Sequence, residues 1–148
     1  MIKKDTSKVT GMVNVVVRDE TTGAIKQEFT VPNLVVDTGL AFIASRMKDA
    51  TATAMSHMAI GTGSTSAAAG DTALETELAR TALTSTTVTT NSVAYVATYP
   101  AGTGTGALTE AGILNAASGG TMLCRTVFAV INKSAADSMT VTWTVTIS

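Results

Sequence analysis

Apolar and polar residues alternate along most of this chain, a pattern that predicts β-strands. The alternation is clearest over residues 139–148, where every second residue is apolar and the residues between them are threonine or serine. Because successive side chains of a strand point to opposite faces, this ribbon has one apolar and one hydroxyl-bearing face. We expect the apolar face, with Trp143, Val141 and Val145, to lie in the core.

Similar runs predict about eight strands in all. They cover residues 12–18, 24–31, 57–60, 83–90, 93–99, 108–114 and 121–132. The first two flank a glycine-containing turn and form a hairpin that places Phe29 in the core and ends at Pro32. The run 121–132 is apolar on both sides, which indicates a central strand or one whose second face a partner covers. Strands at this spacing predict an antiparallel β-sandwich, jelly-roll-like, or a barrel.

One segment has a helical period instead. Leu40, Ile43, Ala44 and Met47 stand at positions i, i+3, i+4 and i+7, which predicts one face of a short helix over about 38–49. Asp37 or Thr38 would cap its N-terminus. We expect Leu40 and Ile43 to pack against the sheets.

The stretch 56–80 interrupts the strands with a long loop of small residues. Gly61 and Gly63 end the strand 57–60, and about ten small residues follow. Leu74 and Leu78 then lie four apart, which predicts one or two helical turns over 73–80. Loops longer than about twelve residues are uncommon in compact domains and often functional. Because this loop lacks an obvious catalytic group, we expect it to contact a partner surface.

Composition favours an assembly. The 148 residues are 45% hydrophobic but only 14% charged, well below the usual share of about a quarter. A charge-poor surface of Thr, Ser, Ala and Gly is easily buried against another subunit. We therefore expect a homo-oligomer built from a single domain, residues 10–148. Residues 1–9 form a lysine-bearing arm that either stays flexible or orders on a neighbouring subunit.

Charge and hydropathy argue against other partners. The net charge of −1 does not provide the basic surface that nucleic acids need. We expect no membrane partner, because no apolar run is long enough to cross a bilayer. The N-terminus shows no secretory signal, and a single cysteine cannot form an intramolecular disulfide.

The candidate chemistry is sparse. His57 is the sole histidine and Cys124 lies far from it in sequence, so neither a metal site nor a Cys–His nucleophile is expected. The glycine run 61–66 lacks the lysine of a phosphate-binding loop. We predict no catalytic residue, no metal and no cofactor.

Four carboxylates are the candidates for acid chemistry: Asp71, Glu75, Glu77 and Glu110. Paired acids serve glycoside hydrolysis or calcium binding, but no aromatic platform for a sugar accompanies them. The interpretation we favour is an ion pair of Arg80 with Glu77 or Glu110 that fixes the loop between the two glycine-rich segments.

A succession of short motifs is similar to small virion proteins of tailed bacteriophages, of the head-decoration and tail-fibre or collar types. The resemblance spans roughly residues 30–145. It implies a non-enzymatic β-sandwich or jelly-roll virion component, commonly oligomeric. The motifs are PNLVVDTGL (32–40), AIGTG (59–63), GDTAL (70–74), ELAR (77–80) and TEAGI (109–113).

Within that family a capsid decoration (cement) protein fits best, because a fibre needs a shaft or a distal receptor-binding region and this chain forms one compact module. We expect a trimer, made in the host cytoplasm and located in the virion, that binds the major capsid protein or other virion proteins. The alternatives are a tail, neck or fibre-anchoring protein, or a receptor- or glycan-binding adhesin module. The interface candidates are Lys3, Lys4, Lys8, Gly61, Gly63 and positions 103 and 105 of the glycine-rich loop 101–106, Thr103 and Thr105.

Overall fold

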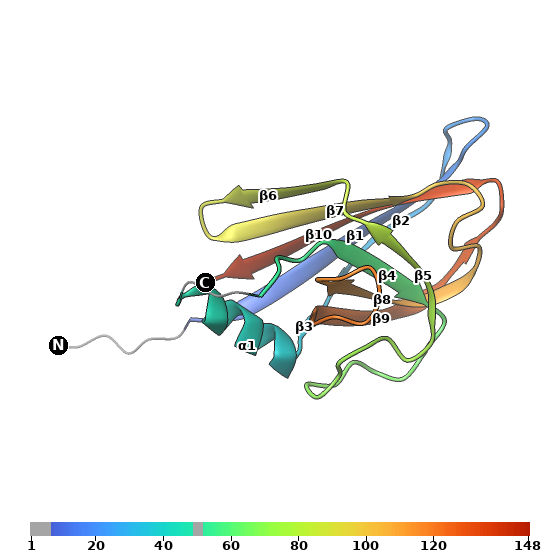
Figure 1. Cartoon of the computed structure of the whole chain (residues 1–148). Coiled ribbons are helices and arrows are strands. Elements are labelled where there is room, and N and C mark those ends of the chain that lie inside the picture. The colour runs from blue at the N-terminus through green and yellow to red at the C-terminus, as the bar shows by residue number, and fades with distance from the viewer. Residues whose placement is uncertain (1–6, 49–51) are drawn as a thin grey trace.

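Two antiparallel sheets of five strands pack face to face in a computed structural model that describes residues 7–48 and 52–148 (Figure 1). The first sheet has the order β2 (Ile25–Pro32), β1 (Val9–Asp19), β10 (Asp137–Ile147), β7 (Ser92–Tyr99), β6 (Ser85–Thr89). The second has the order β3 (Leu34–Val35), β9 (Met122–Lys133), β8 (Gly106–Leu114), β4 (His57–Gly61), β5 (Glu77–Ala82). One helix, α1 (Asp37–Arg46), completes the fold. The predicted mainly-β antiparallel sandwich is therefore confirmed, although it has ten strands and about eight were expected.

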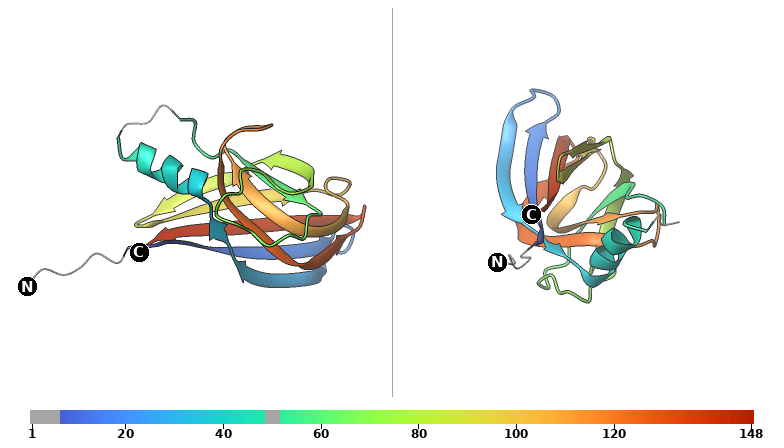
Figure 2. Two further views of the ribbon diagram at one scale, coloured as in Figure 1. Left: turned by 90° about the horizontal axis from the view of Figure 1, so that it is seen from below. Right: turned by 90° about the vertical axis from the view of Figure 1, so that its left-hand side faces the viewer.

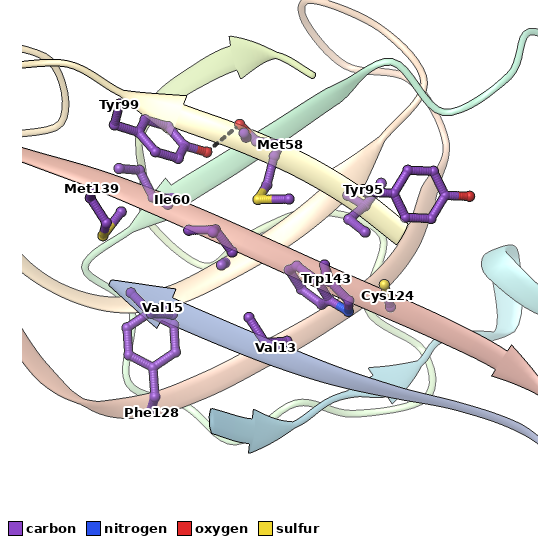
Figure 3. Packing of buried hydrophobic residues seen from close by; sticks show 14 of the residues in the cluster. Val13, Val15, Met58, Ile60, Tyr95, Tyr99, Cys124, Phe128, Met139 and Trp143 are labelled. Carbon is purple, nitrogen blue, oxygen red and sulfur yellow. Dashed lines mark hydrogen bonds between the residues drawn. The ribbon is translucent and has the colours of Figure 1, made fainter. Parts of the chain in front are cut away.

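The core lies between the sheets and centres on β10. Trp143 is fully buried, and Val141 and Val145 are buried beside it, as the alternation predicts. Figure 3 shows Trp143 packed between β1 and residues of the facing sheet, with Cys124 near its ring. Phe29 is half-buried at the edge of this core, where its ring centroid lies 5.7 Å from that of Phe128.

The helix packs on a different face from the predicted one. Leu40 is 46% exposed, so the expectation that it belongs to the core is wrong, whereas Ile43 is half-buried against the core. The buried residue of α1 is Gly39, where an added Cβ would lie 2.0 Å from the carbonyl oxygen of Leu123. The helix therefore approaches β9 backbone to backbone, which rotates Leu40 into solvent.

The prediction of helical turns over 73–80 is also wrong. Residues 73–76 contain bends and no helical turn, and the chain enters β5 at Glu77, which pairs with β4. Of the two leucines spaced for a helical face, Leu74 is buried and Leu78 is 46% exposed.

The N-terminal arm is described only from Ser7. Lys3 and Lys4 lie outside the described residues. Lys8 is exposed, and its backbone pairs with Ser148 through hydrogen bonds of 2.7 and 2.9 Å, so the first sheet begins one residue earlier than the expected domain boundary at residue 10. No helix within the described ranges is both long enough and apolar enough to span a bilayer.

Candidate functional site

The loop 62–76, which joins β4 to β5, covers the outer face of the second sheet. In Figure 1 this loop lies on the side of that sheet opposite the first sheet, whereas Figure 2 shows α1 at one end of the sandwich. Successive strand residues face opposite ways, and β8 follows this rule: Ile113 belongs to the main core, whereas Leu114 belongs to a smaller apolar cluster with Leu74 of the loop. The loop is therefore a third layer of the fold.

A buried ion pair on that outer face holds the loop. Glu110 of β8 has no exposed surface and Arg125 of β9 is 2% exposed. Glu110 Oε1 accepts hydrogen bonds from the backbone N–H groups of Gly63 (3.0 Å) and Thr76 (2.7 Å), and Oε2 accepts one from Glu75 (2.9 Å). Arg125 donates to the same Oε2 from Nε (3.1 Å) and Nη2 (2.9 Å). A buried carboxylate needs this degree of pairing, because an unpaired charge in the interior is very costly.

Arg125 reaches further into the loop. Its Nη1 donates to Asp71 Oδ2 (2.8 Å), and its Nη2 donates to the carbonyl oxygen of Thr65 (3.0 Å). Asp71 Oδ2 in turn accepts a hydrogen bond from the backbone N–H of Ala68 (2.9 Å). One guanidinium thus connects β8 to both halves of the loop.

Glu75 closes the remaining part of the loop. Its Oε1 accepts hydrogen bonds from the backbone N–H groups of Ser64 (3.0 Å) and Thr65 (3.4 Å). We call Glu110, Arg125, Asp71 and Glu75 together the loop anchor. Through the loop anchor, a segment without regular secondary structure between Thr62 and Thr76 acquires fixed contacts along its length.

Three members of the loop anchor, Asp71, Glu75 and Arg125, have pKa values shifted in favour of their charged forms. The N–H of Ala68 lowers the pKa of Asp71, assisted by Arg125, although desolvation opposes this. Hydrogen bonds from Thr65 and Ser64 lower the pKa of Glu75. Burial by itself lowers the pKa of Arg125, but its hydrogen bonds to Glu110 and Asp71 outweigh that effect and raise the pKa.

Gly61 and Gly63 allow the loop to approach the loop anchor, and this corrects their assignment as interface candidates. Both are buried. A Cβ at Gly63 would lie 2.6 Å from Glu110 Oε1, and one at Gly61 would lie 2.2 Å from the carbonyl oxygen of Thr76. Only a residue without a side chain fits at these two buried positions, so glycine is required there by the fold. In the second glycine-rich loop, Thr105 is exposed and Thr103 is half-buried.

The outward side of the loop is small and uncharged over residues 62–70. Backbone groups there are engaged by the loop anchor, while most side chains face solvent. The exposed residues are Thr62, Ser64, Thr65, Ser66, Ala68, Ala69 and Gly70. We call these seven residues the loop surface.

The predicted ion pair of Arg80 forms with Glu77, not with Glu110. The guanidinium of Arg80 donates to Glu77 at 2.6 and 3.0 Å and to the carbonyl oxygens of Ala116 and Gly119 at 2.9 Å each. The pair therefore fixes the turn after β8 and not the long loop. Glu110 is unavailable to Arg80 because Arg125 and the loop backbone occupy it.

Sequence reasoning missed Arg125, which is the centre of the site. The available signal was a single positive charge within the otherwise uncharged and mainly apolar run 121–132. A charge in such a run is buried only when it is paired. A buried Arg125 therefore predicts a carboxylate partner, although the sequence alone does not identify that partner as Glu110.

A second buried cluster, equally unforeseen, holds the turn between β9 and β10. Lys133 is 1% exposed and donates from Nζ to the carbonyl oxygens of Asp137 (2.7 Å) and Pro100 (3.1 Å). The carboxylate of Asp137 accepts hydrogen bonds from Lys26 Nζ (2.8 and 3.0 Å) and from the N–H of Ser134 (2.9 Å). These contacts link both ends of the turn to the loop after β7 and to β2.

The other candidate groups have structural surroundings. His57 Nδ1 lies 2.8 Å from Ser56 Oγ. Cys124 is buried in the core, and burial raises the pKa of its thiol well above the ordinary value. Among residues 7–48 and 52–148, no three His, Cys, Asp or Glu side chains are grouped as a metal ion would require.

Comparison with protein families found no matching family model, and neither curated proteins nor solved structures gave a match. The resemblance to phage virion proteins is therefore carried by the sequence motifs alone.

Proposed function

We propose that the chain is a non-enzymatic structural protein of a tailed-phage virion, a capsid decoration (cement) protein that docks on neighbouring virion subunits through the loop surface. The resemblance supplies the class of assembly. Four of its motifs fall on the site: AIGTG contains Gly61 and Gly63, GDTAL covers Asp71 and Leu74 of the loop, ELAR opens β5, and TEAGI contains Glu110.

The observation that carries the proposal is the fully buried Glu110, whose hydrogen bonds hold a long exposed loop in one conformation. Both carboxylate oxygens are occupied by N–H donors, so this group has no lone pair positioned for a reacting molecule. What the arrangement achieves is a rigid surface. A loop that is ordered before binding loses less conformational entropy when it docks.

The chemistry of the loop surface fits a protein partner. Its hydroxyl, methyl and backbone groups carry no charge, so a neighbouring subunit can cover them with little desolvation cost. A cement protein stabilises a shell by binding a surface that exists only in the assembled lattice, and mass action then favours the assembly. The major capsid protein is the expected partner, and each bound copy would bridge adjacent capsid subunits.

A co-sedimentation experiment tests the proposal. The purified protein is mixed with expanded, undecorated capsids assembled from the major capsid protein of the same genome. Ala68→Lys places a charge in the loop surface, and the matched control Ala24→Lys places the same charge on the exposed turn after β1. Burying an unpaired charge costs a few kcal/mol, so Ala68→Lys should weaken binding at least about tenfold, whereas Ala24→Lys should bind as the wild type does.

Equal binding of the two variants would remove the loop surface from the interface. Binding to purified tails but not to capsids would replace the proposal with a tail, neck or fibre-anchoring role. Binding to a glycan array without binding to either particle would favour the adhesin module.

A further inference from the structure

Most sheet edges of this fold carry features that prevent pairing with another chain. The edge strand β2 contains Lys26, Glu28 and Pro32, and the edge strand β5 contains Glu77 and Arg80. The register of β5 with β4 is also irregular, and β3 is only two residues long. Charges, proline, bulges and short strands are the usual means by which edges avoid association.

On the side away from β8, β9 pairs with β3 only at Cys124 and Arg125, and the described chain provides no further hydrogen-bonded strand on that side. The other sheet covers this part of β9. Thr126 Oγ1 donates to the carbonyl oxygen of Pro32 in β2 (2.8 Å). The rings of Phe29 and Phe128 also meet across this gap. This edge is therefore protected by β2.

The remaining edge, β6, has none of these features. Its five residues, STTVT, are all exposed, and within the described chain it pairs only with β7. Residues 84–92 contain neither a charge nor a proline. The hairpin of β6 and β7 extends to one side of the molecule in Figure 1. An exposed, uncharged edge rich in β-branched residues is a template for another strand.

An apolar groove continues from the inner side of β6. It lies between α1 and β7, has a volume of about 340 Å³, and is lined by residues that include Phe42, Val88, Val93 and Ile147. Val88 is 72% exposed and Ile147 is 48% exposed. Exposed apolar side chains beside an open strand edge mark a surface that gains free energy when covered.

We propose that a second copy of this chain pairs with the first through β6, antiparallel and about a two-fold axis at Thr87. This register matches all five residues of the strand with themselves. Thr87 then faces Thr87 of the partner subunit, and Val88 faces Thr86 of the partner subunit. Threonine pairs and threonine–valine pairs stabilise antiparallel neighbours.

The pairing has consequences for the assembly. The two Val88 side chains become diagonal neighbours on the groove side, and the two first sheets join into one continuous sheet. A two-fold contact uses the same patch on both copies and closes the edge, which gives a discrete dimer and not a filament. The unit is therefore a dimer, where a trimer was expected from the sequence. This inference does not depend on a role in a virion.

Light scattering coupled to size exclusion tests the pairing. From about 1 µM to about 100 µM, a range suited to a modest interface, the wild type should reach twice the chain mass of 15.0 kDa. Thr87→Lys places two like charges directly opposite each other at the axis, so it should raise the dimer dissociation constant at least about tenfold. The matched control Thr30→Lys puts the same charge on the exposed opposite edge of the same sheet and should leave the dimer intact.

A mixing experiment makes the test specific for the axis. Thr87→Glu alone should weaken the dimer as Thr87→Lys does. An equimolar mixture of the two variants should restore the dimer mass, because opposite charges then face each other at the axis. A monomeric or trimeric wild type overturns the inference. So does a dimer that Thr87→Lys leaves intact, or a mixture that stays monomeric. Capsid binding is measured separately, so failure here is distinguishable from failure of the proposed function.

Discussion

Replacing Glu110 with glutamine tests whether the loop anchor holds the loop 62–76. The substitution keeps the shape of the side chain but removes its charge and turns one oxygen into an N–H donor. In the wild type, Oε1 faces the N–H groups of Gly63 and Thr76, and Oε2 faces Glu75 N–H and the Arg125 guanidinium. Whichever position the amide nitrogen takes, it meets N–H donors with no acceptor between them.

The magnitude follows from burial. Glu110 has no exposed surface and Arg125 is 2% exposed, so solvent cannot replace the lost charge. Removing one partner of a buried ion pair costs about 3–5 kcal/mol. A domain of this size is stable by about 5–15 kcal/mol, so the loss is large but does not by itself exclude folding.

Urea unfolding at pH 7 measures the effect. With a slope of about 2 kcal/mol per molar urea, Glu110→Gln should lower the midpoint by about 2 M. Hydrogen exchange should also accelerate at the amides of Gly63, Glu75 and Thr76. The control is Glu77→Gln, which breaks the partly exposed pair with Arg80 and should cost less than about 1 kcal/mol.

Two results would contradict this role of the loop anchor. One is a Glu110→Gln variant that loses less than about 1 kcal/mol of unfolding free energy and keeps the wild-type exchange rates at those amides. The other is rapid exchange of the loop amides in the wild type. Either result would mean that the loop is ordered by something other than the loop anchor.

Two further predictions concern packing and pH. Gly39→Ala should lower the unfolding free energy measured in urea by about 1–3 kcal/mol, because the new Cβ would meet the backbone of Leu123, although alanine is the better helix former. The control Gly70→Ala has open space around it and should be neutral or slightly stabilising. Equal losses in the two variants would contradict the close approach of α1 to β9. The hydrogen bond from Lys26 is the main reason that the pKa of Asp137 is about 2 instead of 3.8. A carboxyl whose pKa is lowered in the folded protein stabilises the fold at a pH above its ordinary pKa, and this contribution is lost as the pH falls through the pKa of the folded protein. Between pH 4 and pH 2 the wild type should therefore lose more unfolding free energy than Asp137→Asn. Parallel losses in the two proteins would contradict this prediction.

The sequence was informative where local pattern and tertiary packing agree. The alternation over 139–148 predicted β10 and the burial of Trp143, because one face of that strand meets the other sheet along its length. The β-sandwich follows from repeating the same argument along the chain. The run 121–132 showed both faces apolar, and the loop covers the second face of its first half, where Met122 clusters with Leu74.

Local pattern failed where distant groups determine the backbone. The leucine spacing at 74 and 78 suggested a helix, but the N–H groups of Glu75 and Thr76 donate to Glu110, 35 and 34 residues away. Helical spacing could not reveal that Gly39, and not Leu40, faces the sheet, because the deciding contact is with the backbone of Leu123. The partners of a buried charge depend on strand register, which the sequence alone does not fix.

Electron cryomicroscopy of expanded capsids mixed with the purified protein tests the central claim most directly, namely that the loop surface docks on a virion lattice. The account predicts added density at regular lattice positions, with residues 62–70 turned toward the capsid. Density confined to the portal vertex or tail, or lattice density in which the loop faces away from the shell, would contradict it.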